Sequence, residues 1–161
     1  MILPSEYQPA DAGEDSDLEA QVEDIFGPEG LLSKANNFEY RQPQQAMATG
    51  VIRALEANKN CVVEAGTGVG KSLAYLIPAI LFGHQHARKA IISTHTINLQ
   101  EQLAEKDLPM LQRILPVEFS YTLLKGRGNY LCPRRLARAL QRADGLFTTP
   151  EIAELKRVEQ W

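Results

Sequence analysis

The sequence predicts an α/β fold in which short parallel strands alternate with helices around a phosphate-binding loop. Residues 65–72 read AGTGVGKS and fit the pattern G-x-x-x-x-G-K-[ST], except that Ala65 replaces the first glycine. Apolar runs with β-forming residues occur at 61–64, 90–93 and 119–124, between segments of helical periodicity. The length of 161 residues and the hydrophobic content of 44% suit one ordinary globular domain. Strands that alternate with helices in this way are typical of a parallel sheet with helices on its faces.

Each element rests on local spacing and on turn residues. Val22, Ile25 and Phe26 suit a short amphipathic turn before Gly27-Pro28. Pro150 suits the first turn of a last helix that Thr148 or Thr149 caps. Between them we expect, in order, a helix over 43–57, a strand over 61–64, a helix over 71–82, a strand over 90–93, a helix over 96–114, a strand over 119–124 and a helix over 133–143.

Charge divides the chain unequally. Residues 1–33 hold nine acidic side chains and no Lys or Arg, whereas the rest holds 11 acidic and 17 basic side chains; the net charge is -3. The polar, acidic stretch 1–24 is therefore expected to be a disordered leader. A basic body is compatible with a polyanionic partner.

Targeting signals are missing from the sequence. No apolar stretch has the length of a transmembrane helix, and the acidic N-terminus differs from a signal peptide. Two cysteines, Cys61 and Cys132, are too few for a disulfide framework. We therefore expect a cytoplasmic protein without a membrane partner.

The loop at 65–72 has the composition of a nucleoside triphosphate site. Its glycines allow successive N–H groups to face a phosphate, and the helix that follows directs its positive dipole end at the same group. Lys71 suits the β- and γ-phosphates, and the Ser72 hydroxyl suits Mg²⁺. A glycine-rich surface turn is the alternative. The candidate nucleotide-binding residues here are Ala65, Gly66, Thr67, Gly68, Val69, Gly70, Lys71 and Ser72.

A second motif, Arg41-x-x-Gln44-x-x-Met47, precedes the loop. A glutamine amide can pair with both the ring nitrogen and the amino group of adenine, although Gln44 could also be an ordinary exposed helix residue. Together with 64–72, this motif resembles the Q motif and motif I of superfamily 2 DNA helicases, in which an alanine at the position of Ala65 is usual. The resemblance implies that Gln44, with Arg41, recognises adenine.

Residues 93–103 follow the second apolar run. Thr94 and Thr96 carry hydroxyls that could contact a phosphate of a nucleic-acid backbone, or one of them could only cap a helix. The stretch is similar to motif Ia of the same helicases, which implies contact with single-stranded DNA.

The run 125–133, KGRGNYLCP, is similar to the entry into the iron–sulfur domain of DinG-type helicases, relatives of the XPD helicases. By itself Cys132 could be an ordinary thiol. The resemblance implies that it is the first of four thiolates on a [4Fe-4S] cluster, with the other three beyond Trp161. Cys61 is expected to pack as a small buried hydrophobic residue.

A basic stretch surrounds Cys132. Arg135, Arg138 and Arg142 fall on one face of the expected helix, and Arg127 precedes it. Such a face could be merely solvated, but in this context we expect it to contact DNA phosphates.

Taken together, the motifs identify the chain as the N-terminal part of a DinG-like ATP-dependent DNA helicase. The implied fold is a partial RecA-like P-loop NTPase domain over 25–124, leading into a helical iron–sulfur insertion over 125–161. The implied cofactors are ATP, Mg²⁺ and the [4Fe-4S] cluster, and the implied partner is single-stranded DNA. A monomer and a role in DNA repair are also expected, with Lys71 and Ser72 as the catalytic residues.

Two alternatives remain at this stage. The chain could be another P-loop enzyme, such as a small-molecule kinase or a transporter ATPase, or a truncated nucleotide- or DNA-binding module. In the helicase interpretation the acidic residue for the Mg²⁺ site lies outside the chain, so the 161 residues alone are expected to have little or no ATPase activity.

Overall fold

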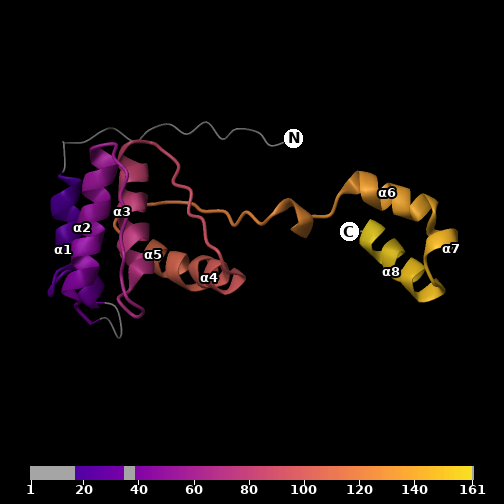
Figure 1. Ribbon diagram of the computed structural model, residues 1–161, viewed down its shortest axis with the longest axis horizontal. Coiled ribbons are helices and arrows are strands. Elements are labelled where there is room, and N and C mark those ends of the chain that lie inside the picture. Colours follow the sequence, from indigo (N-terminus) through magenta and orange to yellow (C-terminus); the bar gives the residue numbers. More distant parts are fainter. Residues whose placement is uncertain (1–16, 35–38, 161) are drawn as a thin grey trace. The chain divides into compact units, whose positions relative to one another are not determined.

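The computed structural model describes residues 17–34 and 39–160 and is drawn in Figure 1. The chain splits into two compact units, Met1–Thr122 and Leu123–Trp161. The division lies two residues before the domain boundary expected from the sequence. Each unit is described by itself.

Three packed helices form the centre of the first unit (Figure 1): α1 (Leu18–Phe26), α2 (Gln42–Glu56) and α3 (Lys71–Gln85). Asp17 caps α1, because its Oδ1 accepts from the backbone N–H groups of Glu19 (3.0 Å) and Ala20 (3.3 Å). The short 3₁₀ helix η1 (Leu31–Lys34) follows α1. Residues 18–24, which the sequence analysis assigned to a disordered leader, lie in helix α1. Residues 1–16 of that expected leader lie outside the described part.

The core of this unit is formed where the apolar faces of these helices meet. From α1 the buried residues are Leu18, Val22, Ile25 and Phe26, which recur at helical spacing. Helices α2 and α3 add buried apolar residues such as Ile52 and Ile77, both fully buried. Burial of a large apolar side chain stabilises a fold by roughly 1.5–3 kcal/mol, so the buried contacts between these helices contribute substantially to the stability of the unit.

The predicted helix over 96–114 is present in three consecutive parts: α4 (Ile97–Gln102), a π-helical turn η2 (Leu103–Asp107) and α5 (Leu108–Ile114). Leu103 and Leu111 are buried in the same core. The turn η2 packs against α3, which brings Asp107 toward the helix that begins at Lys71.

The second unit contains η3 (Arg127–Asn129), α6 (Pro133–Gln141), α7 (Ala143–Leu146) and α8 (Thr149–Glu159). Helix α6 packs against α7 and α8. A capping box starts α8: the Thr148 side chain bonds the first turn, and Glu151 bonds back to the Thr148 N–H at 2.8 Å. The helices predicted over 133–143 and from residue 149 are therefore present.

The α/β prediction is wrong for the described residues, which contain helices and no strand or sheet. The segments 61–64, 90–93 and 119–124 run without ladder pairing, and Val62 (98% exposed) and Ile91 (93%) face solvent. An apolar, β-branched run indicates only a local preference, whereas a strand requires a neighbour to pair with its N–H and C=O groups. These segments do not pair with one another, so the RecA-like sheet is not formed.

The same absence of pairing changes the environment of Cys61. The sequence predicted that this thiol would be buried within a strand, but it is exposed. In the described part of the chain, none of the helices combines the length and the apolar character needed to cross a membrane.

Candidate nucleotide and nucleic-acid site

The phosphate-binding loop leads directly into helix α3. Gly70 is the N-cap of α3, with a left-handed φ of +85°, and Gly68 has a φ of +79°. Non-glycine residues rarely adopt these angles, so the two glycines are required for the path of the loop. Lys71 and Ser72 then occupy the first two positions of the helix, where free backbone N–H groups and the positive dipole end favour an anion.

Lys71 is already engaged with the loop. Its Nζ donates hydrogen bonds to the carbonyl oxygens of Ala65 at 2.9 Å and Gly66 at 2.7 Å. The ammonium group is therefore held on the loop and half-buried. A phosphate that enters the loop can draw this ammonium away from the two carbonyls, because a full negative charge attracts the ammonium more strongly than a carbonyl dipole does.

Gln44 reaches the loop from α2. Its side chain is buried, 3% exposed, and its Nε2 donates to the carbonyl oxygen of Gly70 at 2.9 Å. A Cβ atom built on Gly70 would lie 2.2 Å from the same Nε2, so the contact requires glycine at this position. The alternative of an ordinary exposed helix residue is thus excluded, and the described contact of Gln44 is with the phosphate-binding loop.

Arg41 contacts the loop from the residue before α2. One guanidinium nitrogen donates to the carbonyl oxygen of Gly68, and the other forms an ion pair with Glu39 at 3.1 Å. The side chain is 44% exposed. Arg41 and Gln44 therefore hold the two loop carbonyls that belong to the left-handed glycines.

Ser72 has a neighbour that the sequence analysis missed. Burial raises the pKa of the Tyr75 phenol; a hydrogen bond with Ser72 opposes this rise, and the Asp107 carboxylate adds to it. The sequence signal that could have revealed this neighbour is the separation of three positions between Ser72 and Tyr75, which places them about one helical turn apart. The Ser72 hydroxyl, a suitable oxygen ligand for Mg²⁺, thus lies beside the Tyr75 phenol, which in turn interacts with the Asp107 carboxylate.

Thr96 is a helix cap. Its Oγ1 accepts from the Leu99 backbone N–H at 3.3 Å, at the start of α4. Thr94 donates from its hydroxyl to the Thr96 carbonyl oxygen at 3.4 Å and is half-buried. Thr96 therefore caps α4, which leaves its second hydroxyl lone pair available to another partner, and the contact of Thr94 and Thr96 with nucleic acid stays a prediction.

The second unit carries the basic side chains that the sequence analysis assigned to DNA contact. Arg135 and Arg138 are exposed on α6, and Arg142 is exposed at its end, while Leu136 and Leu140 are half-buried. Arg127 is exposed in η3. Helix α6 is thus strongly amphipathic, with a cationic face toward solvent.

Cys132 is the exposed, free residue before α6. Among residues 17–34 and 39–160, no group of three or more His, Cys, Asp or Glu side chains could hold a metal ion. A [4Fe-4S] cluster takes four thiolates, whereas the sequence contains two cysteines, so the chain by itself does not fit this group.

Comparisons with known proteins match the region that contains the phosphate-binding loop and the basic helix α6. The family model described as DEAD/DEAH box helicase matches residues 42–159, a range that starts at helix α2 and excludes α1. The chain is 42% identical over 147 residues to the ATP-dependent DNA helicase YoaA of Haemophilus influenzae. The matched region covers 90% of this chain and 22% of that protein.

Two further relatives show the same pattern. The chain is 47% identical over 114 residues to the ATP-dependent DNA helicase YoaA of Escherichia coli, covering 70% of this chain and 17% of the relative. It is 44% identical over 108 residues to the ATP-dependent helicase DinG of Mycobacterium tuberculosis, covering 65% and 16%. The chain therefore spans about a fifth of the length of these curated relatives.

Proposed function

The chain belongs to the DEAD/DEAH box helicase family, and from this membership we propose that it forms the N-terminal ATP-binding part of a longer ATP-dependent DNA helicase. The observation that carries the proposal is the phosphate-binding loop together with the side chains that are hydrogen-bonded to its carbonyl oxygens. Two left-handed glycines shape the loop, Lys71 lies on it, and two side chains from the adjacent motif bind its carbonyls.

Within this function the loop binds the triphosphate of ATP. The N–H groups at the start of α3 and the Lys71 ammonium neutralise the charge that develops as water attacks the γ-phosphorus. Ser72 is the residue that would hold Mg²⁺, which supplies further neutralisation of phosphate charge when bound. Gln44 and Arg41 recognise adenine, so that base recognition and loop geometry depend on the same two side chains.

Single-stranded DNA is the proposed partner. Thr94 and Thr96 contact its backbone from the start of α4, and Arg127, Arg135, Arg138 and Arg142 contact phosphates from the second unit. The exposed cationic face of α6 supports this assignment because no described ion pair neutralises its arginines. We also propose that Cys132 supplies one thiolate of a [4Fe-4S] cluster whose remaining ligands lie outside these 161 residues.

The test is ATP hydrolysis by a longer protein that contains this chain, measured with and without single-stranded DNA. Lys71→Ala is expected to lower the DNA-stimulated rate by about a hundredfold, since it removes a group that stabilises developing charge. An unchanged rate in this variant contradicts the proposed role of the loop. The 161 residues alone are expected to hydrolyse little or no ATP. This expectation is contradicted if the 161-residue chain shows DNA-stimulated ATP hydrolysis and Lys71→Ala abolishes it.

A further inference from the structure

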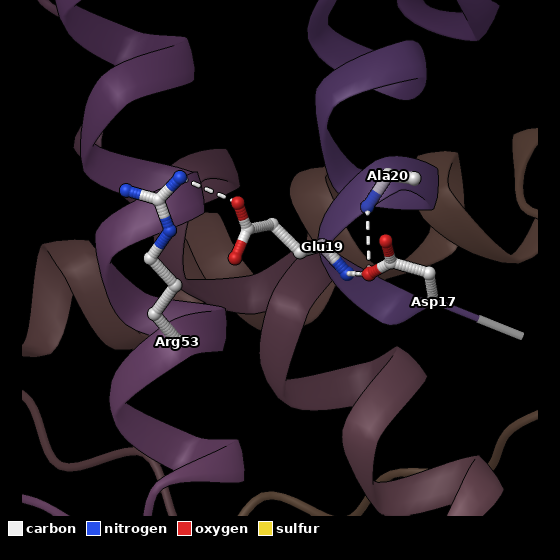
Figure 2. A network of polar contacts seen from close by, with 4 residues as sticks. All are labelled: Asp17, Glu19, Ala20 and Arg53. Atoms are coloured by element: carbon white, nitrogen blue, oxygen red, sulfur yellow. Dashed lines mark hydrogen bonds and ion pairs between the residues drawn. The ribbon is translucent and has the colours of Figure 1, made fainter. Parts of the chain in front are cut away.

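Helix α1 lies outside the range that the family model matches, yet it is firmly attached to helix α2. Its apolar face, including Val22 and Phe26, is buried in the shared core. Figure 2 shows the polar contact beside this core: Arg53 of α2 pairs with Glu19 at 2.5 Å, and Asp17 caps α1. The helix is thus part of the folded unit that contains the nucleotide site.

A second link joins the other end of α1 to the start of α2. The Gln45 Nε2 donates to the carbonyl oxygen of Glu23 at 2.8 Å, and the Gln45 Oε1 accepts from the Tyr40 hydroxyl at 3.0 Å. A primary amide offers one donor group and one acceptor, and here each has a partner of the opposite kind. Gln45 therefore connects the α1 backbone to the segment that precedes α2.

The two residues that contact the phosphate-binding loop lie between these anchor points. Arg41 directly follows Tyr40, and Gln44 directly precedes Gln45. Arg41 binds the Gly68 carbonyl and Gln44 binds the Gly70 carbonyl. A change in the backbone at the start of α2 therefore moves both contacts with the loop at once.

The start of α2 lacks a side-chain cap. Arg41 occupies the N-cap position without a side-chain capping bond, and Pro43 in the first turn has no N–H to donate. A helix start normally gains rigidity from a Ser, Thr, Asp or Asn cap, and this one lacks it. The Gln45 contacts with Glu23 and Tyr40 thus add a polar restraint to a turn that has no side-chain cap.

We propose that Gln45 is a positioning residue through which helix α1 holds Arg41 and Gln44 against the phosphate-binding loop. Its effect on base recognition rests on the proposed function, in which Gln44 and Arg41 contact adenine. Its effect on the loop does not, because Arg41 and Gln44 donate hydrogen bonds to carbonyl oxygens of the loop itself.

The experiment compares Gln45→Ala with Arg53→Ala, which also removes an α1–α2 contact but not one at the start of α2. Hydrogen exchange of the nucleotide-free chain reports the loop amides at 68–71. Titration with fluorescent analogues of ATP and GTP reports affinity and base preference. Matched melting temperatures of Gln45→Ala and Arg53→Ala show that both variants remain folded. Tyr40→Phe, added to each of these two variants, measures the coupling between Tyr40 and Gln45.

Gln45→Ala is expected to speed exchange at the loop amides and to weaken ATP binding about fivefold, with a smaller loss for GTP. Arg53→Ala is expected to leave the loop amides and the ATP-to-GTP ratio unchanged. Loop exchange in Gln45→Ala equal to that in Arg53→Ala overturns the positioning role. Faster loop exchange with equal losses for ATP and GTP keeps that role and overturns its effect on base recognition. If the unaltered chain fails to bind ATP, the proposed function fails, while the exchange data still decide the positioning role.

Discussion

The replacement Gly70→Ala tests whether the phosphate-binding loop depends on the geometry described above. Gly70 has a φ of +85°, and an added Cβ would lie 2.2 Å from the Gln44 Nε2. Alanine would therefore adopt an unfavourable backbone angle and also displace a buried amide from its hydrogen bond.

The magnitude follows from these two effects. A left-handed conformation costs an alanine roughly 1–2 kcal/mol. A displaced Gln44 leaves a buried polar group without its partner, which costs about 1–3 kcal/mol. The variant should thus lose roughly 2–5 kcal/mol in the free energy of unfolding, a large part of the stability of an ordinary domain.

Urea unfolding followed by far-ultraviolet circular dichroism measures this loss. Gly66→Ala is the matched control, because nothing lies within 4 Å of an added Cβ there and no positive φ is involved, so a change within about 0.5 kcal/mol is expected. In a Gln44→Ala background, Gly70→Ala should cost only the backbone strain. Equal stability of the Gly66 and Gly70 variants would refute the described contact between Gln44 and the loop.

Three further predictions concern other parts of the chain. Asp17→Ala removes the cap of α1 and should lower the free energy of unfolding by about 1 kcal/mol in urea melts, whereas Asp17→Asn should retain most of it. Hydrogen bonds from the Thr148 backbone and side chain hold the pKa of Glu151 below its usual range. The contribution of this cap to the stability of α8 should therefore be present above pH about 4.3 and be lost as the pH falls through the lower pKa of the folded state. Amide chemical shifts at the start of α8 should follow this loss, and Glu151→Gln should remove the pH dependence. Replacing Arg135 and Arg138 by Ala should reduce the salt dependence of single-stranded DNA binding by a slope of about 1.4, whereas Arg157→Ala, which loses a residue paired with Glu154, should leave the slope unchanged.

The sequence predicted the helices and the loop well because these depend on nearby residues. Helical spacing and capping residues located α2, α3, α6 and α8 to within a few residues. The strands were wrong because pairing is a property of distant segments, and the apolar run 61–64 has no partner among the described residues. Helix α1 was underestimated because an acidic composition obscured its apolar face.

The candidate site was predictable only in part for the same reason. The pattern G-x-x-x-x-G-K-[ST] located Lys71 and the left-handed glycines, and the spacing to Gln44 indicated a nucleotide motif. The hydrogen bond from Gln44 to the Gly70 carbonyl joins residues 26 positions apart, and the contact of Gln45 with Glu23 joins residues 22 apart. Neither contact has a local signal, so only the packed structure reveals them.

The central claim is that the loop at residues 65–72 binds a nucleoside triphosphate through Lys71. The direct measurement is calorimetric titration of the 161-residue chain with ATP and Mg²⁺, beside Lys71→Ala and the control Lys59→Ala in the exposed segment that follows α2. We expect the unaltered chain and Lys59→Ala to bind equally, and Lys71→Ala to bind about tenfold or more weakly, because it loses a charged hydrogen-bond donor. No binding by the unaltered chain, or equal binding by Lys71→Ala, would contradict the claim.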